Sequence, residues 1–288
     1  MTNSSDKITA TRRIIADGLT FGEGPRWHDG SLWVSDMLAN EILRIELDGR
    51  MQRVAEVSGS PSGLGWLPDG RMLAVSMVDG VVLAIADGQS EVYADLNSIS
   101  GGTPNDMIVD SQGRAYVGNA GCNLFEGLNP NPTNLILVDN GKVSQVADGL
   151  VFPNGMAISP DGNTLFVAET FAHKVTAFTI AVDGSLSDRR AFAELPNRTP
   201  DGICLDAEGA VWVCSAETSE VLRVSDGGAI SECIDLGGRF AAACVTGGEN
   251  RCTLLVVSSD TTPEKFMRGE STCRIEAYNI DIPGVGAP

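Results

Sequence analysis

Histidine is almost absent from this sequence, with only His28 and His173 in a chain of 288 residues. A zinc site built from imidazoles and a Ser-His-Asp triad are both disfavoured by this scarcity. The G-x-S-x-G turn that carries the nucleophile of many serine hydrolases does not occur either. Any hydrolytic chemistry is therefore expected to depend on other residue types.

Positive charge is also scarce. The chain has 20 Lys and Arg against 38 Asp and Glu, a formal net charge of −18, and its basic residues form no cluster. Nucleic acids and anionic membrane surfaces bind basic patches, so neither is an expected partner. The acidity favours solubility and is also compatible with attracting cations.

Long apolar runs are missing as well. No stretch approaches the roughly 18 residues that a membrane span needs, and the first seven residues, MTNSSDK, lack the apolar core of a signal peptide. The cysteines form no C-x-x-C pair, which favours free thiols in a reducing compartment over disulfides or a zinc site. We therefore predict a cytoplasmic protein. The seven cysteines are Cys122, Cys204, Cys214, Cys233, Cys244, Cys252 and Cys273.

What the sequence does contain is a repeat. A ten-residue phrase, of which PNGMAISPDG is one copy, recurs about every 40 to 49 residues, at 21–30, 61–70, 104–113, 153–162 and 200–209, with a degenerate copy at 241–250. An Asp-Gly, Gln-Gly or Glu-Gly turn ends the five clear copies, and a short apolar run such as LFV or VWV follows each of the six. These runs read as strands joined to the phrase by hairpin turns.

A further strand follows in several repeats, at 41–47 and 174–180, and its alternation predicts a half-exposed outer strand. Four short antiparallel strands every 40 to 50 residues are typical of a propeller blade. We therefore predict an all-β fold, a single domain over 1–288 that forms a six-bladed β-propeller. The segments that begin at Arg12 and Cys273 are expected to share one blade and close the ring.

The start of the phrase is where the repeats differ. In a propeller the innermost strand of every blade lines the central channel, so equivalent positions converge near the axis. The second position is Asn105, Asn154 or Asp201 in three copies, and the third position of the first copy is Glu23. Two carboxylates and two carboxamide oxygens suit one hard divalent cation, Ca²⁺, Mg²⁺ or Mn²⁺, and are tolerable for Zn²⁺.

A purely structural interpretation competes with this one. Pro-Asn-Gly and Pro-Asp-Gly are ordinary turn sequences, and Pro-Asp-Gly also occurs at Pro68, in a position that predicts a plain hairpin. Glu23 favours the metal site, since a glutamate between two glycines has no role in a turn.

At these residues the sequence resembles the regucalcin, gluconolactonase and luciferin-regenerating-enzyme family of six-bladed propellers. The motifs that carry the resemblance are GEGPRW at 22–27, PND at 104–106, FPNGM at 152–156 and PDGICLDAEG at 200–209 with VWV at 211–213, in the same order along nearly the whole chain.

The resemblance implies that Glu23, Asn154 and Asp201 ligate the metal, and that Asn105 ligates it or contacts substrate. It also implies that Asp201 is the general base. Sugar-lactone members closest to regucalcin carry an arginine where this chain has Thr103, so a less polar lactone or ester becomes more plausible. The predicted substrate contacts are Asn105, Thr103 and Asn119, the last from segment 118–125 above the same mouth.

The predicted function is divalent-metal-dependent hydrolysis of a lactone or small ester, with water as the nucleophile. Two alternatives stay open. The propeller could bind a ligand or protein without turnover, or it could host another chemistry, such as phosphotriester hydrolysis or a metal-free condensation of the strictosidine-synthase kind. The sequence indicates neither the native ion nor the oligomeric state.

Overall fold

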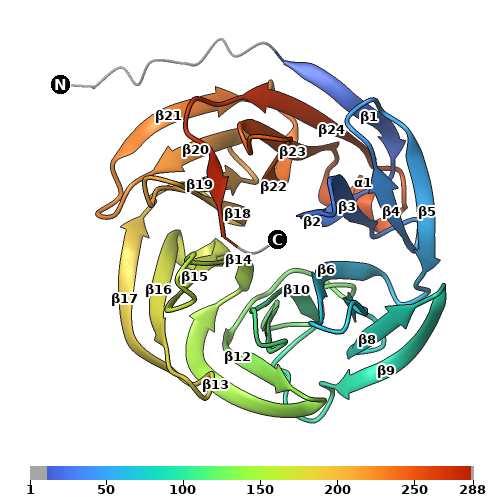
Figure 1. Ribbon diagram of the computed structural model, residues 1–288, viewed down its shortest axis with the longest axis vertical. Coiled ribbons are helices and arrows are strands. Elements are labelled where there is room, and N and C mark those ends of the chain that lie inside the picture. Colours follow the sequence, from blue (N-terminus) through green and yellow to red (C-terminus); the bar gives the residue numbers. More distant parts are fainter. Residues whose placement is uncertain (1–11, 287–288) are drawn as a thin grey trace.

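The computed structural model describes residues 12–286 and arranges them as six antiparallel sheets around a central axis (Figure 1). The predicted six-bladed β-propeller is confirmed. Helix within these residues is limited to the single turns η1 (Thr170–Ala172) and α1 (Pro263–Met267), and none of it is long and apolar enough to cross a membrane. Residues 1–11, for which the sequence predicts no signal peptide, lie outside the described part, as do residues 287 and 288.

Each blade runs from the axis outward in chain order. Blade 1 comprises β2 (Gly22–His28), β3 (Ser31–Asp36), β4 (Glu41–Ile45) and β5 (Met51–Glu56). Blade 2 comprises β6 (Pro61–Trp66), β7 (Met72–Ser76), β8 (Val81–Ala86) and β9 (Gln89–Asp95). Blade 3 comprises β10 (Pro104–Val109), β11 (Ala115–Asn119), β12 (Pro132–Asp139) and β13 (Lys142–Val151).

The second half of the ring departs slightly from this pattern. Blade 4 comprises β14 (Pro153–Ile158), β15 (Thr164–Glu169), β16 (Lys174–Ile180) and β17 (Leu186–Glu194). Blade 5 comprises β18 (Pro200–Asp206), β19 (Val211–Ser215), β20 (Glu220–Val224) and β21 (Ile230–Asp235), and the short β25 (Gly284–Val285) pairs with the inner edge of β18. Blade 6 comprises β22 (Phe240–Gly247), β23 (Thr253–Asp260), β24 (Thr272–Asn279) and β1 (Arg13–Leu19).

The ring is closed by strands from both ends of the chain, as the sequence predicts. β1 is the outermost strand of blade 6 and pairs antiparallel with β24, with Arg13 opposite Ala277 and Leu19 opposite Cys273. The two segments lie side by side in Figure 1. Because this pairing joins the first described strand to the last blade, it ties the two ends of the ring together.

The hairpin turns form where the phrase predicts them. Gly70 and Gly162 have φ angles of +91° and +74°, which residues with a side chain rarely adopt. No disulfide joins the seven cysteines, all of which lie within residues 12–286.

Two details of the sequence interpretation are wrong. The third strands are mostly buried rather than half-exposed, because side chains of the next blades cover both of their faces; exposure is concentrated on the fourth strands, such as β5 and β9. The first copy of the phrase is also out of phase by one residue. Gly22 pairs with Asp36 as Pro104 pairs with Asn119, so Gly22 and not Phe21 is equivalent to the prolines.

The closing strand generates a test of the fold. Ile15 is 7% exposed and packs in the core between blades 6 and 1, whereas its neighbour Ile14 is 45% exposed. We expect Ile15→Ala to lower the free energy of unfolding by about 2 to 5 kcal/mol and Ile14→Ala to lower it by less than about 1 kcal/mol. Urea denaturation measures both, and equal losses would show that β1 is not packed as described.

Candidate functional site

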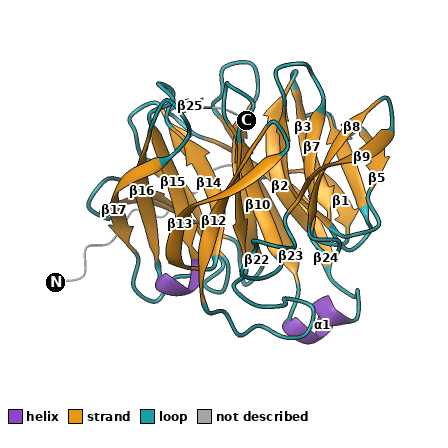
Figure 2. Ribbon diagram, turned by 90° about the horizontal axis from the view of Figure 1, so that it is seen from below, coloured by secondary structure: helices purple, strands orange, loops and turns teal. Residues whose placement is uncertain are grey.

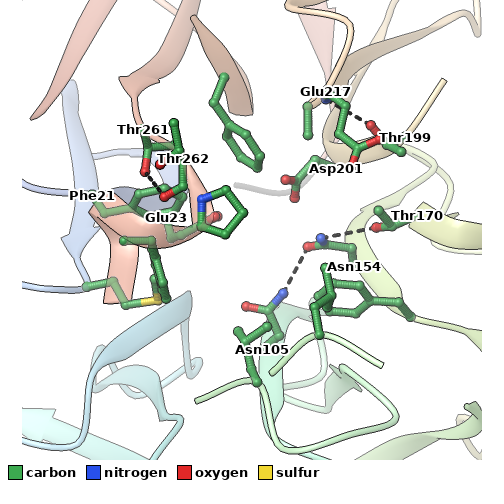
Figure 3. Close-up of a pocket in the computed structure, with 18 of the residues that line it drawn as sticks. Phe21, Glu23, Asn105, Asn154, Thr170, Thr199, Asp201, Glu217, Thr261 and Thr262 are labelled. Atoms are coloured by element: carbon green, nitrogen blue, oxygen red, sulfur yellow. Dashed lines mark hydrogen bonds between the residues drawn. The ribbon is translucent and has the colours of Figure 1, made fainter. Parts of the chain in front are cut away.

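The site lies at one end of the axis, where the six innermost strands begin. These strands contact one another in the cyclic order β2, β6, β10, β14, β18 and β22. The corrected register places one residue of each at the same level, and all six are buried: Glu23, Ser62, Asn105, Asn154, Asp201 and Ala242. Figure 3 shows Glu23, Asn105, Asn154 and Asp201 turned toward the same space.

Glycine at the following position permits this convergence. A Cβ atom on Gly155 would overlap the backbone carbonyl of Asp201, and one on Gly202 would overlap Ala243 of the next blade. The inner strands therefore approach too closely for side chains here, and the preceding polar side chains are directed to the axis. The glycines of the Pro-Asn-Gly and Pro-Asp-Gly phrases have this packing role.

The two carboxamides are held by a chain of hydrogen bonds that joins four blades. Ser62 Oγ donates to Asn105 Oδ1 at 2.9 Å, and Asn105 Nδ2 donates to Asn154 Oδ1 at 3.1 Å. Asn154 Nδ2 then donates to Thr170 Oγ1 at 3.3 Å, and Thr170 Oγ1 donates to the Pro200 carbonyl at 2.8 Å. This chain orients both amide groups before any ligand binds (Figure 3).

The two carboxylates have weaker support: Glu23 accepts a hydrogen bond from the backbone of Gly24, and Asp201 accepts one from the side chain of Asn154. Glu23 and Asp201 are 8% and 5% exposed, and neither forms a salt bridge within the described residues. Asp201 Oδ1 is buried with no hydrogen-bond partner. Burial, followed by the charge of Asp106, raises the pKa of Glu23 from 4.5 to about 8. Burial, followed by the charge of Glu23, raises the pKa of Asp201 well above its usual range. The axis therefore lacks positive charge at these oxygens.

A buried ion pair that the sequence interpretation missed lies next to this cluster. Arg26 reaches from blade 1 past blade 2, where its Nε donates to the Leu64 carbonyl at 3.1 Å. Its Nη2 donates to Asp106 Oδ1 in blade 3 at 3.1 Å. Burial still raises the pKa of Asp106, and the Arg26 charge opposes that shift. The signal for this pair in the sequence is Asp106 itself, since four of the other copies have glycine at this position and the fifth has alanine.

A cavity of about 340 Å³ opens above the polar cluster. Glu23, Asn105, Asn154 and Asp201 all line it, and most of its other lining residues are apolar. Its walls come from loops between strands and from the segment around α1, on the side of the ring opposite β25 (Figure 2). The loop after β11 contributes Leu124 to the wall of the cavity. This agrees with the predicted position of segment 118–125 above the mouth of the site.

Two predicted substrate contacts are not brought to this cavity. Thr103 Oγ1 accepts the Leu124 backbone N–H at 3.1 Å and so supports the loop rather than lining the space. Asn119 is fully buried at the end of β11, where its Nδ2 donates to the Asn134 carbonyl at 2.9 Å. Both side chains are used within the protein, and Asn105 is the one of the three that lines the cavity.

The donor set fits a hard divalent cation. Within residues 12–286, no group of three or more His, Cys, Asp or Glu side chains is arranged to hold a metal, so an ion at the axis would need carboxamide oxygens as well. Glu23, Asp201, Asn154 and Asn105 supply two anionic and two neutral oxygens. The unpartnered Asp201 Oδ1 is the observation that most directly favours a ligand there.

This combination defines a class: six-bladed propellers with a carboxylate and carboxamide cluster on the axis. Residues 21–260 match the family model described as SMP-30/Gluconolactonase/LRE-like region, and the chain belongs to that family.

Relatives match over nearly their whole length. A 6-deoxy-6-sulfogluconolactonase from Pseudomonas putida is 27% identical, over 96% of each chain. A pentonolactonase from Haloferax volcanii is 26% identical, over 98% of this chain and 97% of its own. The calcium-binding protein regucalcin from Agrobacterium tumefaciens has the same fold, with a TM-score of 0.81, 21% identity and 97% of each chain covered.

The raised pKa of Glu23 predicts how the metal-free protein responds to pH. A carboxyl whose pKa is 4.5 unfolded and about 8 folded stabilises the fold below 4.5, and that contribution is lost as the pH rises through 8. In EDTA, we expect the melting temperature of the wild type to fall relative to that of Glu23→Gln between pH 5 and pH 8. Glu217→Gln, at the exposed rim of the same cavity, is the matched control and should parallel the wild type. Parallel curves for all three proteins would contradict the shift.

The Arg26–Asp106 pair makes a second prediction. Arg26→Gln leaves the Asp106 carboxylate buried without its cation, and we expect a loss of about 3 to 5 kcal/mol in the free energy of unfolding. Arg190→Gln breaks the exposed pair with Asp226 and should cost about 1 kcal/mol or less. Chemical denaturation measures the free energy of unfolding of both variants. Similar losses would show that the buried pair contributes no more to stability than an exposed one.

Proposed function

We propose that this protein hydrolyses a lactone, or a small carboxylic ester, with the help of one divalent cation held by Glu23, Asn154, Asp201 and Asn105. The observation that carries the proposal is the pair of buried carboxylates beside two tethered carboxamides on the floor of a ligand-sized cavity. An oxygen-only site accepts several divalent ions, with Ca²⁺, Mg²⁺, Mn²⁺ and Zn²⁺ as the candidates.

The cation supplies Lewis acidity, which polarises a carbonyl group and makes water more acidic. Asp201 is suited to be the general base, because its carboxyl group points into the cavity and its Oδ1 has no hydrogen-bond partner. Asn105 is suited to orient the carbonyl, because its amide group is held by Ser62 and Asn154. Glu23, the first acid of the pair, balances the charge of the cation.

The reaction is balanced without a covalent intermediate. Water adds to the carbonyl carbon while Asp201 accepts one of its protons. The bond between the acyl carbon and the ring oxygen then breaks, and the proton passes to that leaving oxygen. The product is a hydroxy acid, or an acid and an alcohol from an ester. No histidine lines the cavity among the described residues, which agrees with a carboxylate as the base.

The relatives support the same reaction class. The two curated relatives described above are named for lactones, and the family description includes gluconolactonase. Regucalcin from A. tumefaciens is called a calcium-binding protein, which agrees with a cation at the axis.

Substitution of the acids tests the proposal. We expect Asp201→Asn to lower kcat by about 10² to 10⁴, the contribution of a general base. We expect Glu23→Ala to weaken cation binding and lower kcat/KM about a hundredfold or more. EDTA should abolish turnover of a panel of γ- and δ-lactones, and added Ca²⁺, Mn²⁺, Mg²⁺ or Zn²⁺ should restore it.

Glu249→Gln is the control, since Glu249 is exposed and does not line the cavity; it should leave turnover within about twofold of the wild type. Turnover that survives EDTA would overturn the role of the cation, and no lactone or ester turnover with any ion would overturn the reaction class.

A further inference from the structure

The walls of the cavity are built largely from aromatic rings. Phe152, at the start of blade 4, stacks with Phe171 in η1 at 5.7 Å between ring centroids. On the other side, Phe21 contacts Phe240 at 5.8 Å and Phe266 at 5.1 Å. Four of these five rings come from different connections between strands, Phe240 is the first residue of β22, and together they enclose the space directly above the polar floor.

The few hydroxyl groups on the walls each have a hydrogen-bond partner within the protein. Thr170 Oγ1 donates to the Pro200 carbonyl, and Thr262 Oγ1 donates to Glu264 at 2.9 Å. Thr261 Oγ1 donates to the Thr262 carbonyl at 3.3 Å, and Thr199 Oγ1 accepts the Glu217 backbone N–H at 2.9 Å. A substrate with many hydroxyls would leave water for a cavity with few free partners, and unpaired polar groups are costly to bury.

Charge on the walls also selects against one class of ligand. No lysine, arginine or histidine is among the described residues that line the cavity, whereas Glu217 presents an exposed carboxylate at its rim. An anionic substituent would therefore meet negative charge with no cation to pair with on the walls.

Apolar side chains continue outward to the solvent. Leu128, in the loop between β11 and β12, and Met267, at the end of α1, line the cavity and are 53% and 58% exposed. Large apolar residues at the rim extend the binding surface beyond the ring of phenylalanines.

We infer that the substrate is a neutral lactone or ester with an apolar substituent, alkyl or aryl. This substituent lies against the phenylalanine walls and extends toward solvent between Leu128 and Met267. This inference rests on the proposed function for the reacting group, and it adds the chemistry of the rest of the molecule. Polyhydroxylated and anionic lactones are the disfavoured classes.

Lactams test the inference without relying on turnover, because they keep the carbonyl and ring shape and resist hydrolysis. The titrations use about 1 mM Ca²⁺, the upper end of the Kd range of extracellular calcium sites. We expect calorimetry to show that 5-alkyl-γ-lactams bind more tightly as the alkyl chain lengthens. Each added methylene should lower Kd about threefold to fourfold, until the chain passes the rim. Glucono-δ-lactam should bind more weakly than every member beyond 5-ethyl.

Charge at the rim provides the matched variants. Leu128→Lys and Met267→Lys should each weaken binding of the 5-hexyl lactam about fivefold or more and strengthen binding of a lactam with a terminal carboxylate on the same chain. Val182→Lys is the control, because Val182 is also apolar and 90% exposed but does not line this cavity. It should leave both affinities unchanged.

The outcomes separate this inference from the proposed function. Affinity that is flat along the series, tighter binding of glucono-δ-lactam, or equal effects of the three lysine variants would overturn the apolar substrate class. If alkyl lactams bind as expected but no lactone or ester is hydrolysed, the apolar binding site stands and the reaction class falls.

Discussion

The close approach of the innermost strands is the constraint on which the rest of this structure depends. Six strands that meet around one axis leave no room for a Cβ atom at Gly155 or Gly202, where a methyl group would overlap the backbone of the next blade. The residue before each of these glycines must therefore direct its side chain into the axial space. Packing alone brings Asn154 and Asp201 together. The pairing of β1 with β24 keeps the ring of blades closed and so maintains this packing.

That geometry has an electrostatic consequence. Glu23 and Asp201 are buried at the same level of the axis, and burial raises the pKa of both. The Asp106 charge adds to the shift of Glu23, and the Glu23 charge adds to that of Asp201. Arg26 lies close enough to lower the pKa of Glu23, but its guanidinium group donates its hydrogen bonds to Asp106 and to backbone carbonyls. The fold thus gathers two carboxyl groups that are costly to ionise without a cation beside them. A bound divalent cation would relieve this cost, and it would supply the Lewis acidity that the proposed lactone hydrolysis uses.

The sequence was sufficient for the fold and for the polar floor, because both repeat along the chain. Turns and apolar runs predicted six blades, and the residues that differ within the phrase predicted Glu23, Asn105, Asn154 and Asp201, all of which line one cavity. The sequence alignment of the first repeat is wrong by one residue, because Phe21 stands where the other copies appear to have proline. Strand pairing shows that Gly22 is the equivalent residue, so Glu23 takes the second position of the phrase. Thr103 and Asn119 were misplaced for another reason: their side chains satisfy local backbone groups, which no spacing indicates. Most of the walls could not be predicted, because they come from loops that do not repeat; segment 118–125, which contributes Leu124, is the exception.

The central claim is that one cation is bound on the axis by oxygens of Glu23, Asn154, Asp201 and Asn105, which come from four blades. Anomalous diffraction from crystals soaked in Mn²⁺ tests it most directly. We predict a single strong peak per chain, within about 2.0 to 2.6 Å of carboxylate or carboxamide oxygens of Glu23, Asn154 and Asp201. A peak elsewhere, or a fully soaked crystal with no peak at the axis, would contradict the account.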